Sequence, residues 1–140
     1  MSRLLASGVI ILVVWTVFDV LIHRLLLGQI YEDNPNLRRP FEQMNVVLIY
    51  IVTFILIGTF VGAYWLLVQP KSLVAGIGLG AFMGLALGIS AGFGTYIHMP
   101  IPLGLAWGWL IAGWLKGIAA GAVVGAIIIE PGRRSRTGHR

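Results

Sequence analysis

The chain has 140 residues, of which 58% are hydrophobic and only 11% are charged, and its formal net charge is +5. Soluble domains carry about 25% charged residues, so this composition excludes a water-exposed domain and predicts an integral membrane protein. The absence of cysteine excludes disulfides, thiolate metal sites and iron–sulfur clusters. Nucleic acid is not an expected partner, because the body of the chain lies in lipid and the basic residues gather at its C-terminus.

Four segments are long and apolar enough to cross a hydrocarbon core about 30 Å thick, which takes about 20 residues of helix. Prolines in the links at 70–72 and 98–102 separate the last three segments, because proline cannot continue a helix. The expected fold is an all-α membrane protein with a single four-helix transmembrane domain over residues 1–130 and a basic cytoplasmic tail over 131–140. The predicted spans are residues 4–27, 44–68, 73–97 and 103–129.

The distribution of Lys and Arg predicts the orientation of these spans. The two termini and the 70–72 link together hold six basic residues, whereas the opposite side holds three. Cytoplasmic loops carry the excess of positive charge, so both termini are expected in the cytoplasm. Arg24, Trp107 and Trp109 then fall near the outer interface, where such side chains anchor helices in the headgroup region.

Polar residues interrupt the first span. Thr16, Asp19 and His23 recur at spacings of three and four residues, so they form one stripe along a helix. Asp19 lies roughly 12 Å below the outer end of the span, at a depth where a lone carboxylate must find a partner. Lys116 lies in the middle of the fourth span and can reach that depth, so we predict an Asp19–Lys116 pair. The pair either fixes helix register or belongs to a proton relay, an ion relay or a substrate counter-ion site.

Glycine recurs at every fourth residue in the third span and in most of the fourth. Residues at this spacing lie nearly in line on one helix face, and the missing side chains let two helices approach closely. The sequence therefore predicts antiparallel packing of these two spans, with contact to a second copy or a larger partner as the alternative. The ladder glycines are Gly76, Gly80, Gly84, Gly88, Gly92, Gly113, Gly117, Gly121 and Gly125.

Further polar residues are expected near the outer surface. His23 and His98 can approach each other there with Met99 adjacent, which suits copper, zinc or haem, although hydrogen-bonded structural histidines are the alternative. The loop between the first two spans is expected either to cover the bundle mouth as a lid or contact surface, or to be a solvated connector. Its charged residues are Glu32, Asp33, Arg38, Arg39 and Glu42.

Three stretches carry a resemblance to known proteins: FDVLIH…LLLG.IYE from Phe18, RRP.EQM from Arg38, and PIP…GW.I.G…G..AG...G from Pro100. On these residues the chain resembles a group of small bacterial four-helix integral membrane proteins. The resemblance covers most of the four spans and implies a fold and a bacterial inner-membrane location, but no activity. In its length and its acidic first span the chain is also similar to small multidrug resistance transporters, which carry glutamate where this chain has Asp19.

The functional prediction follows from the few polar groups at membrane depth. The sequence has no Walker loop, nucleophile elbow or dinucleotide fingerprint, so enzyme activity is not expected. The leading interpretation is a homo-oligomer or an accessory subunit of a larger membrane complex, with lipid and membrane proteins as partners and no required cofactor. The alternatives are a proton- or ion-coupled transporter using Asp19, His23 and Lys116, and a metal- or haem-binding redox subunit using His23 and His98.

Overall fold

The computed structural model describes residues 1–37 and 39–129, and every regular element in that part of the chain is a helix. As predicted, four helical segments are long and apolar enough to cross a membrane. Their boundaries differ from the predicted ones by less than one helical turn. The predicted tail over 131–140 lies outside the described residues. The four segments are Ser2–Leu26, Val46–Leu67, Leu73–His98 and Leu103–Ile127.

Two of the four segments change from α-helix to π-helix along their length, at Leu21 and at Ser90. A π-turn accommodates one more residue than an α-turn, so it rotates the side chains that follow, and such turns are frequent at functional sites. In chain order the elements are α1 (Ser2–Val20), η1 (Leu21–Leu26), α2 (Gly28–Asp33), η2 (Pro35–Leu37), η3 (Phe41–Gln43), α3 (Val46–Leu67), α4 (Leu73–Ile89), η4 (Ser90–Gly94), α5 (Thr95–His98) and α6 (Leu103–Ile127).

Short polar side chains and proline mark where the long helices begin. The side chain of Asn45 accepts a hydrogen bond of 3.0 Å from the backbone of Leu48 at the start of α3. The hydroxyl of Ser72 accepts one of 3.1 Å from the backbone of Ala75 at the start of α4. These caps satisfy amide donors that the first turn of a helix leaves without a partner. Pro102 immediately precedes α6.

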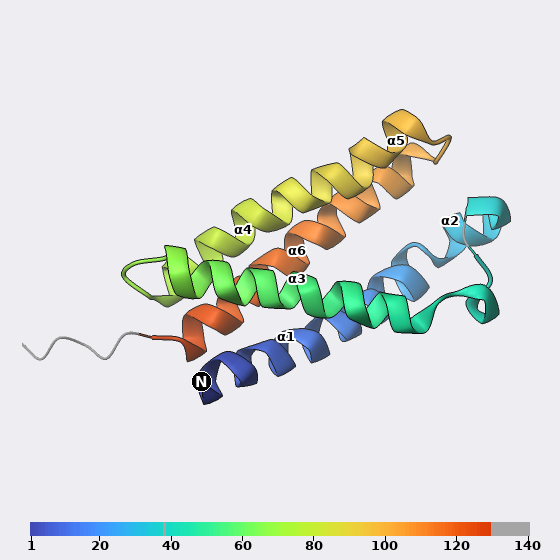
Figure 1. Ribbon diagram of the computed structural model, residues 1–140. Coiled ribbons are helices and arrows are strands. Elements are labelled where there is room, and N and C mark those ends of the chain that lie inside the picture. The colour runs from blue at the N-terminus through green and yellow to red at the C-terminus, as the bar shows by residue number, and fades with distance from the viewer. Residues whose placement is uncertain (38, 130–140) are drawn as a thin grey trace, which may run out of the picture.

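Figure 1 shows α4 and α6 side by side along their lengths, with α1 and α3 inclined to them. The N-terminus, the link between α3 and α4, and the last turn of α6 lie at one end, which we call the terminal end. The helices α2 and α5 lie at the opposite end, which we call the α2 end. The most extensive packing joins α4 to α6, and α1 packs against both α6 and α3.

The contact between α4 and α6 is made by backbone rather than by side chains. Gly76, Gly80, Gly84 and Gly88 are the buried residues of α4. A Cβ atom placed on Gly84 would lie only 2.9 Å from the Cα atom of Gly117 in α6, closer than real Cβ atoms come to backbone. Such an approach lets many weak backbone contacts form between the helices. The other ladder glycines that meet backbone across this contact are Gly92, Gly113, Gly121 and Gly125.

Side chains pack the rest of the interior in two separate clusters. The larger cluster lies toward the terminal end and joins α1, α3 and α6. The smaller one lies toward the α2 end and joins η1, the α5–α6 link and the first turns of α6. Asp19 falls between Trp15 of the first cluster and Ile22 of the second, so the polar group sits where the two apolar cores separate. Representative members are Ile11, Phe60 and Val124 in the larger cluster, and Leu27, Ile101 and Leu105 in the smaller.

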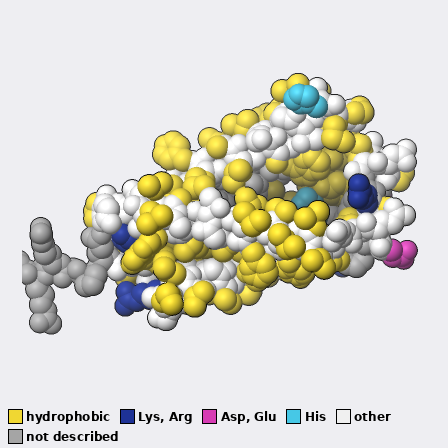
Figure 2. Space-filling model, in the orientation of Figure 1, with side chains coloured by type: hydrophobic (Ala, Val, Ile, Leu, Met, Phe, Trp, Pro, Cys, Tyr) yellow, Lys and Arg dark blue, Asp and Glu magenta, His cyan; other side chains and the backbone are white. Residues whose placement is uncertain are grey.

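The two halves of α3 differ in their exposure. From Val46 to Leu56 no side chain is buried, whereas Ile57, Phe60 and Tyr64 in the second half belong to the larger cluster. Figure 2 shows hydrophobic side chains spread over this face of the molecule, with charged side chains gathered toward its two ends. This distribution suits a surface that contacts the hydrocarbon core of a bilayer.

Candidate functional site

An ion pair between α1 and α6 forms the centre of the candidate site. Lys116 Nζ donates to both carboxylate oxygens of Asp19, at 2.7 and 2.9 Å. The ammonium also lies 5.2 Å from the ring centroid of Trp15, whose indole N–H donates to the Lys116 carbonyl at 2.9 Å. The side chain of Lys116 is 20% exposed and that of Asp19 is 49% exposed, so the protein covers the cation more fully than the anion.

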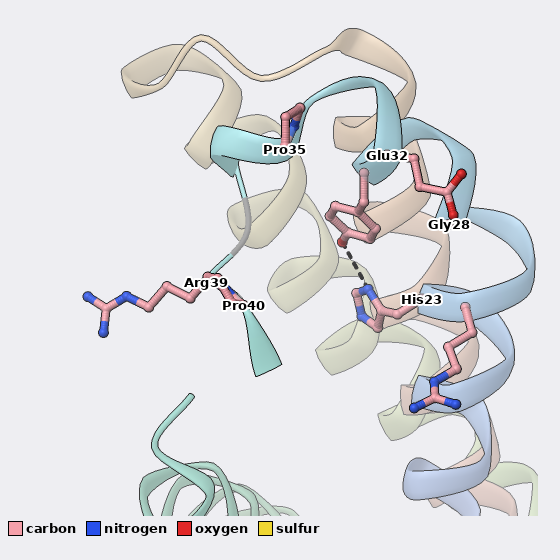
Figure 3. Close-up of a pocket in the computed structure, with 8 residues that line it drawn as sticks. His23, Gly28, Glu32, Pro35, Arg39 and Pro40 are labelled. Carbon is pink, nitrogen blue, oxygen red and sulfur yellow. Dashed lines mark hydrogen bonds between the residues drawn. The ribbon is translucent and has the colours of Figure 1, made fainter. Parts of the chain in front are cut away.

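The polar group continues from Asp19 toward the α2 end. His23 Nε2 lies 4.0 Å from Asp19 Oδ1, and His23 Nδ1 lies 2.9 Å from the hydroxyl of Tyr31. Figure 3 shows this second contact as a dashed line. The indole N–H of Trp109 donates to the same hydroxyl at 2.8 Å. The structure therefore brings Lys116, Asp19, His23 and Tyr31 into one series.

One tautomer of His23 gives the donors in this series a single direction. Indole N–H can only donate, so the oxygen of Tyr31 accepts from Trp109, and its hydroxyl either donates to His23 Nδ1 or accepts from it, depending on the tautomer. In the tautomer whose Nδ1 accepts, the neutral imidazole carries its proton on Nε2, which lies 4.0 Å from Asp19 Oδ1. The 4.0 Å gap exceeds hydrogen-bond distance, so proton transfer across it requires the ring to rotate or a water to bridge the two groups.

Cavities flank the series on both sides of His23. A cavity of about 590 Å³ at the α2 end is lined by His23, Arg24, Tyr31 and residues of the following loop. A second cavity, of about 350 Å³, lies between the four long helices and is lined by His23, Asp19 and Lys116 among mainly apolar residues. Figure 2 shows the molecule hollowed near the α2 end. His23 is thus shared by a cavity at the α2 end and an open cavity between the four long helices.

A third cavity, of about 330 Å³, lies between α1 and the first half of α3. Asp19 lines it as well, so one carboxylate borders two cavities that are open to the outside. Toward the terminal end the larger apolar cluster joins α1, α3 and α6, and a further cavity of about 470 Å³ between α1 and α3 has an almost wholly apolar lining. The surroundings of the site are therefore polar toward the α2 end and apolar toward the other.

Thr16 and His98 lie apart from this series. The hydroxyl of Thr16 donates to the Leu12 carbonyl of its own helix at 2.8 Å. His98 Nδ1 lies 2.8 Å from the Gly94 carbonyl, and His98 and Met99 are both exposed. No group of three or more His, Asp or Glu side chains placed to hold a metal ion is found among residues 1–37 and 39–129.

The charged loop residues are exposed, and two of them reach the site. Glu32 and Arg39 line the cavity at the α2 end, although Figure 3 shows the Arg39 side chain pointing away from His23. Asp33 and Glu42 are exposed elsewhere on the loop. Arg38 lies outside the described residues.

The residues expected at the interface have different surroundings. Trp107 is half exposed, with its ring edge-on to Phe93 at 5.0 Å between centroids. Trp109 is only partly exposed and makes the hydrogen bond to Tyr31. Arg24 is exposed at the mouth of the α2-end cavity.

Sequence reasoning missed Trp15 and Tyr31 as members of the site, and it expected Trp109 only as an interfacial anchor. These three side chains contact the ion pair and the imidazole through the hydrogen bonds described above. The spacing of Trp15 and Asp19, four residues apart on one helix, was a signal available for Trp15. Tyr31 had no such signal, because its position depends on the π-turn and on the chain reversal after Leu26.

Comparison with protein-family models, with curated proteins and with solved structures gives no match to this chain.

Proposed function

We propose that this chain is a small multi-pass protein of the bacterial cytoplasmic membrane, with both termini in the cytoplasm, that takes up protons through the polar site around Asp19. One observation carries the proposal. Lys116, Asp19, His23 and Tyr31 follow one another at 2.7, 4.0 and 2.9 Å, from the middle of α6 to the cavity at the α2 end. Ionisable residues placed inside a membrane mark proton and ion pathways more often than packing sites.

The chemistry of the series suits proton uptake from the α2 end. Histidine gains and loses a proton near neutral pH, and its two ring nitrogens can accept on one side and donate on the other. A proton that reaches His23 can pass from Nε2 to the Asp19 carboxylate. Neutral Asp19 then no longer holds Lys116 by charge, so proton loading weakens the ion pair that joins α1 to α6. Proton binding and helix packing are coupled at this point.

The apolar cluster on the far side of the pair favours a coupled transporter over an open channel. Ile11, Ile57 and Val124 are buried there, so a proton on Asp19 faces mainly apolar side chains among the described residues on this side. Release to the cytoplasm therefore requires the α1–α6 contact to change. The glycine contact between α4 and α6 supplies a fixed pair of helices against which α1 and α3 can move.

Proton uptake into liposomes tests the proposal. Purified protein is reconstituted with a pH-sensitive dye inside, an imposed pH gradient, and valinomycin with potassium to prevent a membrane potential from building up. The wild-type protein should acidify the interior and Asp19→Asn should abolish the uptake. Asp33→Asn, which removes an exposed carboxylate of α2, is the matched control and should keep the wild-type rate. Wild-type uptake by Asp19→Asn would contradict the proposal.

A second candidate, a subunit of a homo-oligomer or of a larger membrane complex, is favoured by the exposure of Asp19 and of the first half of α3. A half-exposed carboxylate at membrane depth is stabilised by a covering protein surface as well as by water. Disulfide cross-linking tests self-association, because the natural chain contains no cysteine. Ile51→Cys should form a cross-linked dimer, whereas Val74→Cys on the outside of α4 should not. Equal yields at both positions would count against a specific dimer.

A further inference from the structure

We infer that the cavity beside the Asp19–Lys116 pair binds a small, uncharged, lipid-soluble molecule that carries a hydrogen-bond acceptor such as a carbonyl oxygen. The inference rests on the proposed function in that it names what the same site accepts, but binding does not require protons to move. The cavity has a volume of about 350 Å³ and is bordered by all four spanning segments. Sites for small molecules run from about 300 to 1,000 Å³, so this cavity suits a compact ligand such as a single substituted ring.

The walls of the cavity are apolar and two of them are rigid. The indole N–H groups of Trp15 and Trp109 are both engaged, one with the Lys116 carbonyl and the other with Tyr31. Each ring is thereby held in one orientation before a ligand arrives, which lowers the entropy lost on binding. The remaining apolar wall consists of Leu56, Leu87, Ala91, Ala112 and Gly113.

The polar end of the cavity favours an acceptor. An ammonium has three N–H donors, and Lys116 uses two of them on the oxygens of Asp19. The third N–H has no hydrogen-bond acceptor among the described residues. The side chain of Lys116 is only 20% exposed, so a ligand that supplies a carbonyl or ether oxygen to this N–H gains a charge-assisted hydrogen bond in a partly desolvated place.

The same contacts disfavour charged ligands. An organic cation is attracted by carboxylates and by aromatic faces, but Lys116 already occupies Asp19 and lies over the ring of Trp15. An anion would meet the Asp19 carboxylate, which borders the same cavity. An uncharged molecule avoids both conflicts and also partitions into the bilayer.

Another cavity adjoins this one on the side of α1 and α3. The third cavity, between α1 and the first half of α3, shares Asp19, His23 and Trp15 with it. The first half of α3 has no buried side chain and is apolar enough to face the hydrocarbon of a bilayer. A lipid-soluble molecule can therefore approach between α1 and α3 without crossing the aqueous loop.

Calorimetric titration of protein in lipid nanodiscs tests the inference with three probes of similar ring size. Duroquinone offers two carbonyl oxygens, durene has the same methylated ring without them, and tetraphenylphosphonium is a lipid-soluble cation. Duroquinone should bind at least about tenfold more tightly than durene, because a site with an unpaired donor discriminates against a ligand that cannot accept. Equal affinity for the two, or tighter binding of the cation that Asp19→Asn abolishes, would overturn the inference.

A pair of variants on one stretch of helix locates the binding. Ala91→Phe fills the cavity and should weaken duroquinone binding at least about tenfold. Ala86→Phe adds the same ring to an exposed position of α4 that does not line the cavity, and should bind as wild type. Both positions are exposed, so both variants should fold, which circular dichroism in the same nanodiscs checks. Equal weakening by both, or by neither, would place the bound ring elsewhere and overturn the inference.

The two proposals for this site fail separately. If Ala91→Phe weakens duroquinone binding and Asp19→Asn still takes up protons at the wild-type rate, the binding site is supported and the proton relay is contradicted. If proton uptake depends on Asp19 but duroquinone does not bind, the proton relay is supported and the binding site is contradicted.

Discussion

The α4–α6 pair and the α1–α3 pair are built on opposite principles. In the first, glycines bring backbone against backbone, and an added methyl group at Gly84 would meet the neighbouring helix at 2.9 Å. In the second, side chains such as Ile11 and Phe60 pack between the helices, and a cavity of about 330 Å³ lies between α1 and the first half of α3. The close α4–α6 contact leaves no space for the two helices to shift against each other. The α1–α3 pair has a cavity beside it, and the ionisable side chain of Asp19 borders that cavity.

We expect the α4–α6 pair to serve as a rigid support and the α1–α3 pair to carry the movable part of the site. A close-packed backbone contact has a single geometry, because any shift along it brings atoms into collision. Side-chain contacts around a cavity allow several arrangements that differ little in free energy. Lys116 joins the two parts, since it projects from the rigid pair and binds Asp19 on the adaptable one. The predictions that follow disturb first the rigid pair, then the junction, then the adaptable pair.

The largest expected effect comes from a methyl group placed between α4 and α6. Gly80→Ala should lower the free energy of unfolding by about 3 kcal/mol, because the new Cβ collides with the backbone of Gly117, which cannot move aside. Unfolding in mixed detergent micelles, followed by circular dichroism, measures the change. Gly78→Ala on the same helix meets open space and should be neutral or stabilising by up to about 1 kcal/mol. Equal destabilisation by the two variants would mean that the close contact does not hold the pair together.

A smaller loss is expected when the junction between the two parts is broken. Lys116→Met leaves Asp19 without its partner and should cost about 2 kcal/mol of stability, below the range for fully buried pairs because the carboxylate is half exposed. Adding Asp19→Leu to it should recover most of the loss, and the exchanged pair Asp19→Lys with Lys116→Asp should recover part of it. A double-mutant cycle in the same detergent system gives the coupling. Additive losses would show that the two side chains act independently.

In the adaptable part, Tyr31→Phe should cost about 1 kcal/mol, because it removes a hydroxyl that serves both Trp109 and His23. It should also slow proton uptake into liposomes, since His23 loses its polar contact toward the α2-end cavity. Tyr96→Phe removes the hydroxyl of an exposed tyrosine of α5 and is the matched control, with no expected change in either measurement. A control that behaves like Tyr31→Phe would refute the specific role of the Tyr31 hydroxyl.

The smallest effect is expected at Thr16, although it shares a helix stripe with Asp19. Its hydroxyl bonds to the Leu12 carbonyl of its own helix. Thr16→Val should therefore change the free energy of unfolding by less than about 0.5 kcal/mol, measured as above. A loss comparable to that of Lys116→Met would mean that the hydroxyl supports the ion pair.

Sequence patterns were sufficient to predict the spans because lipid imposes simple rules. A run of about 20 apolar residues must be a helix in a bilayer, since every backbone group has to be paired within the segment. Prolines in the links at 70–72 and 98–102 indicated where the last three spans are separated. The structure places the helix boundaries within one turn of those predicted. The π-turns at Leu21 and Ser90 were not predicted, because their hydrogen-bond pattern leaves no periodicity in so few residues.

The site was less predictable than the fold. The depths of Asp19 and Lys116 follow from counting residues at a fixed rise per residue, and the structure brings these two side chains into contact. The partner of His23 does not follow from depth. Tyr31 comes next to it only because the chain turns after η1 and α2 folds back, and such reversals depend on tertiary packing. His98, which sequence depth placed near His23, instead bonds to the Gly94 carbonyl within its own helical segment.

The unequal lengths of the helices connect the site to the thickness of the bilayer. With 22 residues, α3 is about 33 Å long, whereas α6, with 25, is about 38 Å long at 1.5 Å per residue. A helix longer than the hydrocarbon core fits by tilting, and Figure 1 shows the α4–α6 pair inclined to α3 and spreading from it toward the α2 end. A thicker bilayer should draw the rigid pair upright and narrow the cavity at Asp19, whereas a thinner one should widen it. Lipid chain length thus becomes a physical control on access to the ion pair.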